Sequence, residues 1–324
     1  MNRTYISAAV VALVGIALAA ASLLQPDAVG FIGLVLASAA MPTAVLLVVI
    51  GKLGRKVPVV ALISGGTLAV GMSLAGYAIV GGAAYFVLGD FAEWLVDSGD
   101  GLIDADLMRS IRDPWMILLA IDLIVLAPLI EEFSKAVGAR LARPSDRKSA
   151  VLAGVSAGVG FAVVENIMYA TGGLFDIGGW EVVALVRMLG SAVHPVAAGL
   201  VSLGWWEFRN HRQHSGSFKL IAVGVGVHAL WNGAVMAVFV ASVVFSGDAT
   251  PLESVLVTMG YAGALGVIIA VGGWQSLTRV AADELPAATA DPGNAKTMSA
   301  WVVIASTMLV PAIAVVFALS TGGN

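Results

Sequence analysis

The sequence has no cysteine and few charged residues, and both absences narrow the classes of protein to which it can belong. Without cysteine, the 324-residue chain forms no disulfide, no iron–sulfur cluster and no thiol nucleophile. Charged residues make up 12% of the chain, whereas a soluble domain carries about 25%. The formal net charge of −4 argues against a nucleic-acid partner. This composition lacks the charged surface of a water-soluble protein.

The apolar residues, 59% of the chain, occur in long runs. A run of about 18 or more such residues crosses a hydrocarbon core of about 30 Å as a helix. The sequence therefore predicts an all-α, polytopic transmembrane helix bundle in the lipid bilayer, with about nine spans. The predicted spans are residues 5–24, 29–50, 58–87, 114–141, 149–171, 181–205, 219–246, 252–274 and 299–320. The third and fourth are overlong, which predicts tilted or interrupted helices.

Lysine and arginine residues follow alternate predicted spans, and this pattern predicts the orientation of the chain. Basic residues follow the second, fourth, sixth and eighth spans, and the exception is Arg109 and Arg112 after the third. Because cytoplasmic connections carry the excess of basic residues, the N-terminus is predicted to be cytoplasmic and the C-terminus outside. Residues 88–113 are then an external acidic loop, and residues 275–298 a cytoplasmic linker.

The fourth predicted span contains a close group of ionisable side chains, Glu131, Glu132 and Lys135. Each such group costs roughly 2.5–3.5 kcal/mol near the bilayer centre, so each requires a reason. Lys135 lies one helical turn after the two glutamates and can neutralise one of them. Pro128 lacks an amide hydrogen, and a helix that restarts there would place both glutamates near a favourable N-terminal dipole. The second carboxylate, without a partner in its own helix, points to a function.

The fifth and sixth predicted spans add further polar groups. Glu165 and Asn166 lie in the fifth, and Glu165 needs a partner from another span. In the sixth, Arg187 and His194 share one helical face, and Arg187 is the expected counter-ion for a neighbouring glutamate. A rise of about 1.5 Å per residue puts Glu165 in the outer half of the membrane and Glu132 in the inner half. A broken fourth helix or shifted span ends would be needed to bring the two together.

The seventh predicted span places His228 and Asn232 on one helical face. In the fifth span, Gly154 and Gly158 have the spacing that lets two helices approach closely. Carboxylates and imidazoles together can activate water, either by general base catalysis or through a metal. The sequence has neither the His-Glu-x-x-His of common zinc proteases nor the Gly-x-Ser-x-Gly of serine hydrolases.

The order of these motifs resembles the PrsW family of bacterial membrane proteases, relatives of the CAAX prenyl endopeptidases and bacteriocin-processing enzymes. Four motifs on consecutive spans carry the resemblance: Glu-Glu-x-x-Lys at 131–135, Phe-x-x-x-Glu-Asn at 161–166, the histidine at 194 and His-x-x-x-Asn at 228–232. The resemblance implies that the two adjacent glutamates are the central catalytic pair. Glu165 stands where the CAAX relatives usually place a histidine, and His194 would supply that imidazole. His228 and Asn232 would bind the scissile carbonyl or the developing oxyanion.

The resemblance also implies a place and a substrate. The chain would be a multi-pass protease of the bacterial cytoplasmic membrane that hydrolyses a peptide bond in a single-pass membrane protein, such as site-one cleavage of an anti-sigma factor. Residues 114–246 would form a catalytic four-helix core, and residues 1–113 and 247–324 would be accessory transmembrane regions.

Metal dependence stays open from the sequence. A divalent metal such as Zn²⁺ accepts histidine and glutamate ligands, and the candidates are Glu132, Glu165, His194 and His228, on four different spans. The nearby basic residues, Lys135 among them, would repel a cation. A metal-free site in which a glutamate acts as general base accounts for those basic groups.

Three other functions are compatible with the same residues. An ion-coupled transporter would relay protons along intramembrane acids, a CAAX-type prenyl endopeptidase would cleave a prenylated substrate, and a non-catalytic scaffold would use the polar groups for packing. The arrangement in space discriminates between them. Convergence of Glu131, Glu132, Glu165, His194 and His228 on one pocket favours the protease, a polar path across the bilayer favours the transporter, and dispersal favours the scaffold.

Overall fold

The computed structural model describes residues 3–24, 28–81, 120–171, 190–210, 214–244 and 273, and every element in them is helical. The elements, with η marking π-helical turns, are α1 (Arg3–Leu24), α2 (Ala28–Leu53), α3 (Val59–Ser64), η1 (Gly65–Ala69), α4 (Val70–Gly76), η2 (Tyr77–Gly81), η3 (Asp122–Leu126), α8 (Ala127–Arg140), α9 (Arg147–Thr171), α11 (Val193–Asn210) and α12 (His214–Val244). The all-α class is confirmed for these residues.

Four of the described helical stretches are long and apolar enough to cross a membrane. They are Val35–Leu53, Val59–Ile79, Arg147–Tyr169 and Gly216–Met236. A chain with several such helices is a membrane protein. The predicted loop 88–113, linker 275–298 and span 299–320 lie outside the described residues, as does span 252–274 apart from Gly273. The total of nine spans and the orientation of the termini stay predictions.

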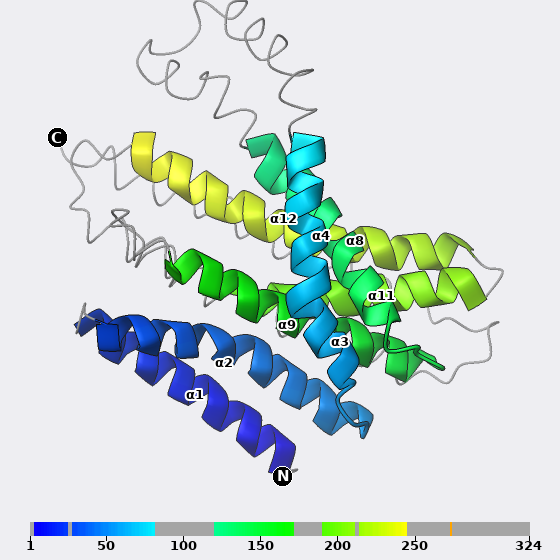
Figure 1. Ribbon diagram of the computed structural model, residues 1–324, viewed down its shortest axis with the longest axis horizontal. Coiled ribbons are helices and arrows are strands. Elements are labelled where there is room, and N and C mark those ends of the chain that lie inside the picture. The colour runs from blue at the N-terminus through cyan, green and yellow to red at the C-terminus, as the bar shows by residue number, and fades with distance from the viewer. Residues whose placement is uncertain are drawn as a thin grey trace, which may run out of the picture.

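Helix α9 is the central element of the described bundle. It packs against α11, α2, α3 and α8, while α1 and α2 lie side by side as an antiparallel pair along one edge (Figure 1). A Cβ atom on Gly158 would lie 2.5 Å from the carbonyl oxygen of His194 in α11. A Cβ atom on Gly154 would collide with the carbonyl oxygen of Ala198, one turn further along α11. Only glycine permits this approach, so the close packing predicted from the glycine spacing is confirmed.

Both of the overlong predicted spans contain π-helical turns. Turns η1 and η2 flank α4, and η3 runs directly into α8 two residues before Pro128. The backbone at Leu126 keeps helical dihedral angles, φ −71° and ψ −45°, so the helix does not stop at the proline. A π turn inserts an extra residue and shifts the helical register without ending the helix. The restart considered for Pro128 is therefore a change of helical register.

Three connections lie at the same end of the bundle. Arg55, between α2 and α3, donates a hydrogen bond of 2.8 Å to Asp146, which directly precedes α9. Arg147, the first residue of α9, pairs with Glu207 near the end of α11 at 2.8 Å. The connections after the second, fourth and sixth predicted spans thus share one side, as the alternation of basic residues predicts. The assignment of that side to the cytoplasm stays a prediction.

Candidate active site

Six ionisable side chains from four helices meet inside the bundle, and we refer to them as the polar cluster. The polar cluster comprises Glu131, Glu132 and Lys135 of α8, Glu165 of α9, His194 of α11 and His228 of α12. All are buried except Glu165, whose side chain is 12% exposed. Helices far apart in the sequence therefore bring carboxylates, imidazoles and an ammonium group to one place. This convergence is what an enzyme requires.

Lys135 lies at the centre of the polar cluster. Its Nζ atom is 3.1 Å from Oε2 of Glu131, 2.7 Å from Oε1 of Glu132 and 2.8 Å from Nδ1 of His194. The ammonium group also lies 4.1 Å from the centre of the Phe161 ring, at cation–π distance. A fully buried cation is tolerated only with such partners. The ion pair expected along α8 is present, and it involves both glutamates.

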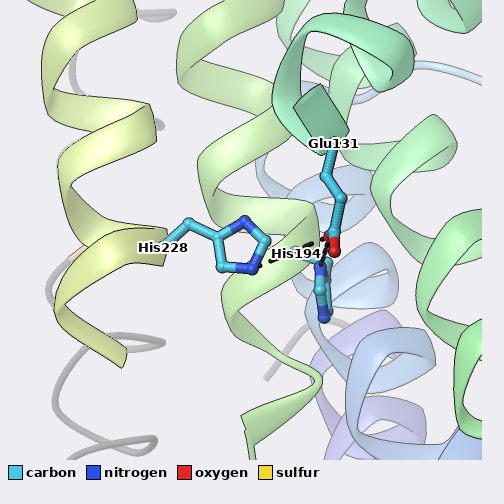
Figure 2. Close-up of side chains that lie close together, drawn as sticks. All are labelled: Glu131, His194 and His228. Atoms are coloured by element: carbon cyan, nitrogen blue, oxygen red, sulfur yellow. Dashed lines mark ion pairs between the residues drawn. The ribbon is translucent and has the colours of Figure 1, made fainter. Parts of the chain in front are cut away.

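Each histidine of the polar cluster has one ring nitrogen beside a carboxylate. Nδ1 of His228 lies 2.9 Å from Oε1 of Glu132, and Nε2 of His194 lies 3.0 Å from Oε2 of Glu165. The other nitrogens, Nε2 of His228 and Nδ1 of His194, are each 3.7 Å from Oε2 of Glu131. Figure 2 shows the Glu131 carboxylate reaching both imidazoles. His194 thus bridges Glu131 and Glu165, which explains how residues expected at different depths share one site.

Tyr77 also contacts the polar cluster, although no motif in the sequence predicts that it does. Its hydroxyl donates a hydrogen bond of 2.5 Å to Oε1 of Glu131. Tyr77 begins η2, in a predicted span that has no carboxylate or imidazole. A phenol is neutral near pH 7, so a tyrosine in a membrane span does not stand out as a carboxylate or an imidazole does. The only sequence feature that distinguishes Tyr77 is its position directly after a glycine, Gly76.

The asparagines of the Phe-x-x-x-Glu-Asn and His-x-x-x-Asn motifs donate hydrogen bonds to backbone carbonyl groups. Asn166 donates to the carbonyl oxygen of Ser38 in α2 at 3.0 Å, and Asn232 donates to that of Leu123 in η3 at 2.8 Å. Asn232 thereby ties α12 to the π turn that leads into α8. Arg187 lies outside the described residues, so its role as a counter-ion stays a prediction.

The polar cluster contains a group of donors that can hold a metal ion. Ligand atoms of Glu131, His194 and His228 lie within 4.8 Å of one another. Tetrahedral zinc with bonds of about 2.0–2.2 Å places its ligand atoms roughly 3.3–3.6 Å apart, close to the observed 3.7 Å from Glu131 to either imidazole. Nε2 of His228 is buried and has no hydrogen-bond partner in the described part of the chain. The residues therefore fit a metal.

The surroundings of the imidazoles also fit a metal, although Lys135 competes with it. A metal-binding histidine usually directs its second ring nitrogen to a carboxylate or carbonyl group, and here Glu132 and Glu165 occupy those positions. Both glutamates were candidate ligands from the sequence, but Glu131 lies between the imidazoles. The Lys135 ammonium group already contacts Glu131 and His194. It would have to move aside when a cation binds.

Membrane-spanning helices around a buried cluster of carboxylates and imidazoles, groups that together can activate water, fit an intramembrane hydrolase. A family model described as PrsW family intramembrane metalloprotease matches residues 66–264, more than half of the chain, and the chain belongs to this family. The resemblance read from the four motifs is confirmed, and the protein is a protease. Comparison with curated proteins and with solved structures finds no match.

Proposed function

We propose that the chain is a metal-dependent intramembrane endopeptidase that cleaves a single-pass protein in a bacterial cytoplasmic membrane. The observation that carries the proposal is the buried convergence of Glu131, His194 and His228, with a carboxylate behind each imidazole. Membership of the protease family supports peptide-bond hydrolysis. The motif resemblance supports a membrane-anchored anti-sigma factor as the substrate.

In this proposal Glu131, His194 and His228 hold a divalent cation such as Zn²⁺, and Glu132 is the general base. When bound, the cation would make a water molecule more acidic and polarise the scissile carbonyl group. Oε1 of Glu132 is held by Lys135 and His228, while Oε2 is buried without a hydrogen-bond partner among the described residues. Oε2 can therefore take the proton from the attacking water and return it to the leaving amine.

The position of Lys135 favours a second candidate, in which no metal takes part. Its ammonium group contacts Glu131 and His194, two of the three donor residues, and forms ion pairs with both carboxylates of α8. One of these glutamates then acts as general base alone, an effect typically worth about 10²–10⁴-fold in rate. The two candidates differ in the role of Glu131, which is a ligand in the first and a carboxylate partner of Lys135 in the second.

Two neighbouring isosteric variants separate these candidates. We expect Glu131→Gln to lose both the metal and peptidase activity, because the amide is a poor ligand for zinc. Glu132→Gln should retain the metal and lose about 10²–10⁴-fold in kcat, because it removes only the base. The measurements are zinc content and cleavage of a reconstituted single-pass substrate. Two results together would contradict the metal-dependent candidate and favour the metal-free one. The wild-type enzyme would stay active after chelation, and both variants would have the same metal content as wild type.

A further inference from the structure

Tyr77 contacts Glu131 close to where two π-helical turns pack against each other. Turn η2, which begins at Tyr77, packs against η3, which leads into α8, and α4 packs against α8. Each π turn shifts the helical register and so turns the following side chains toward a different face, and such turns are frequent at functional sites. The third predicted span thereby delivers a phenol to a site built by α8, α9, α11 and α12.

Gly76 allows the close approach that this contact requires. A Cβ atom on Gly76 would lie 2.6 Å from Cγ2 of Ile130, the residue before Glu131. Real Cβ atoms do not approach another heavy atom so closely, so a side chain at position 76 would force Ile130 out of its rotamer or push α4 away from α8. The adjacent pairs Gly76–Tyr77 and Ile130–Glu131 therefore form one contact, in which the glycine provides the space and the tyrosine provides the hydrogen bond.

The hydrogen bond gives the two oxygens of Glu131 different tasks. Oε1 accepts from the Tyr77 hydroxyl, and Oε2 faces Lys135 and both imidazoles. A hydroxyl donating to a carboxylate forms one of the stronger hydrogen bonds in proteins. A glutamate has three rotatable side-chain bonds, and without this restraint its carboxylate can turn away or present both oxygens to a cation. The phenol fixes one oxygen and leaves the other as a single ligand atom.

We propose that Tyr77 is a positioning residue of the active site, which holds Oε1 of Glu131 so that Oε2 faces the two histidines. This inference rests on the proposed function, because it assigns to Tyr77 the orientation of a residue that the proposal places at the cation. It extends the functional site beyond the four-helix core at residues 114–246, into the third predicted span. Loss of an outer residue that orients a metal ligand typically weakens metal affinity or activity by about 10–100-fold.

The test is Tyr77→Phe, which keeps the aromatic ring and removes only the hydroxyl group. We expect kcat to fall about 10–100-fold and zinc affinity, measured by competition with a chelator, to fall by a similar factor. KM should change less than about threefold, because the hydroxyl binds Glu131 and not the substrate. If Tyr77 had a purely structural role, Tyr77→Phe would lower the unfolding temperature and would not lower kcat selectively while KM stays nearly constant. Wild-type kcat and wild-type zinc affinity in Tyr77→Phe would overturn the inference.

A pair of glycine variants tests the same contact from the backbone. Gly76→Ala should reproduce the loss of kcat and zinc affinity, whereas Gly71→Ala in the same helix should behave as wild type, because a Cβ atom there meets nothing within 4 Å. Equal behaviour of the two variants would contradict the role of the close approach. If Gly76→Ala fails to fold, the outcome for Tyr77→Phe decides alone. A wild-type enzyme that neither cleaves nor binds zinc would overturn the proposed function and this inference together, whereas a normal wild type with a normal Tyr77→Phe overturns only the inference.

Discussion

The α1–α2 pair and the helices around the polar cluster differ in where their charged side chains lie and in how far their apolar side chains are buried. In α1 and α2 the charged side chains are confined to the end turns, at Arg3 and Lys52. Large apolar side chains on these helices are exposed, with Leu13 at 66% and Ile32 at 57%. By contrast, α9 has 72% of its membrane-length stretch buried. The ionisable groups of the polar cluster therefore lie where protein surrounds them, as their high cost in lipid requires.

The two regions are nevertheless connected close to the site. Asn166 of α9 donates to the carbonyl oxygen of Ser38 in α2, and its chain neighbour Glu165 lies beside His194. Helix α2 of the α1–α2 pair, the outer pair, thus contacts α9 at the level of the polar cluster. The α1–α2 pair carries charge only at its ends, but a polar contact between the two regions holds Asn166, the residue next to Glu165 of the polar cluster.

The largest expected effect comes from removing the central cation of the interior region. Lys135→Met leaves Glu131 and Glu132 buried without their counter-ion, and breaking a buried pair in this way typically costs about 3–5 kcal/mol. In the outer pair, Lys52→Met removes an exposed cation at a helix end, for which about 0.3–1 kcal/mol is expected. Both are measured as the free energy of unfolding in detergent, without metal.

Added zinc sharpens this prediction. A divalent cation held by Glu131, His194 and His228 would replace the missing positive charge, so zinc should remove most of the stability deficit of Lys135→Met relative to wild type. Zinc should stabilise Lys52→Met and wild type equally, so the small deficit of Lys52→Met should stay the same. If zinc has no effect on Lys135→Met, the ammonium group is an obligatory part of the site, and the metal-free candidate is favoured.

Predictions from sequence were most successful for the outer region and least successful for the contacts of the interior. The apolar runs at 5–24 and 29–50 predict α1 and α2 to within a few residues, because lipid-facing helices need only length and hydrophobicity. The acids and imidazoles of the cluster could be selected because they are rare in membrane spans. Their partners on other helices could not be predicted, because which faces meet depends on register shifts such as η3. Tyr77 was missed for a different reason, since a phenol is neutral near pH 7 and does not stand out among the ionisable groups of a membrane span.

Packing at glycine residues is the next feature in which the two regions can be compared, between α9 and α11 in the interior and between α1 and α2 in the outer pair. Gly158→Ala places a methyl group against the backbone of His194, and overpacking of this kind costs about 1–3 kcal/mol. Gly15→Ala in α1 meets the Cβ atom of Ala40 in α2, so a similar loss of stability is expected. Only Gly158→Ala should also lower kcat, because it displaces His194.

Gly226→Ala, where a Cβ atom meets nothing within 4 Å, is the neutral control for both variants. The measurements are unfolding in detergent and cleavage of a reconstituted substrate. Normal kcat in a destabilised Gly158→Ala protein would show that the position of α11 is less critical to catalysis than the geometry around His194 suggests.

The smallest expected effect lies outside the membrane, at the start of α9, where Asp146 caps the helix. The Ser149 amide donates to Oδ1 of Asp146 at 2.8 Å, and the Asp146 amide donates to the Ser149 hydroxyl oxygen at 2.9 Å, a reciprocal cap. Partial burial would raise the pKa of the Asp146 carboxyl group, but the hydrogen bonds from Ser149 and the charge of Arg55 outweigh it and lower this pKa.

A lowered pKa in the folded state means that Asp146 contributes stability above the unfolded pKa of about 3.9 and loses it as the pH falls through the folded pKa. Asp146→Ala should therefore reduce the free energy of unfolding by about 0.5–2 kcal/mol at pH 7, the usual cost of losing such a cap, and by less below about pH 4. Arg55→Met removes only the exposed ion pair and should cost about 0.2–1 kcal/mol at pH 7. Unfolding of both variants in detergent at pH 7 and at pH 3 is the measurement. A deficit for Asp146→Ala that is as large at pH 3 as at pH 7 would mean that the carboxylate charge contributes nothing, and that the side chain acts only as a neutral cap.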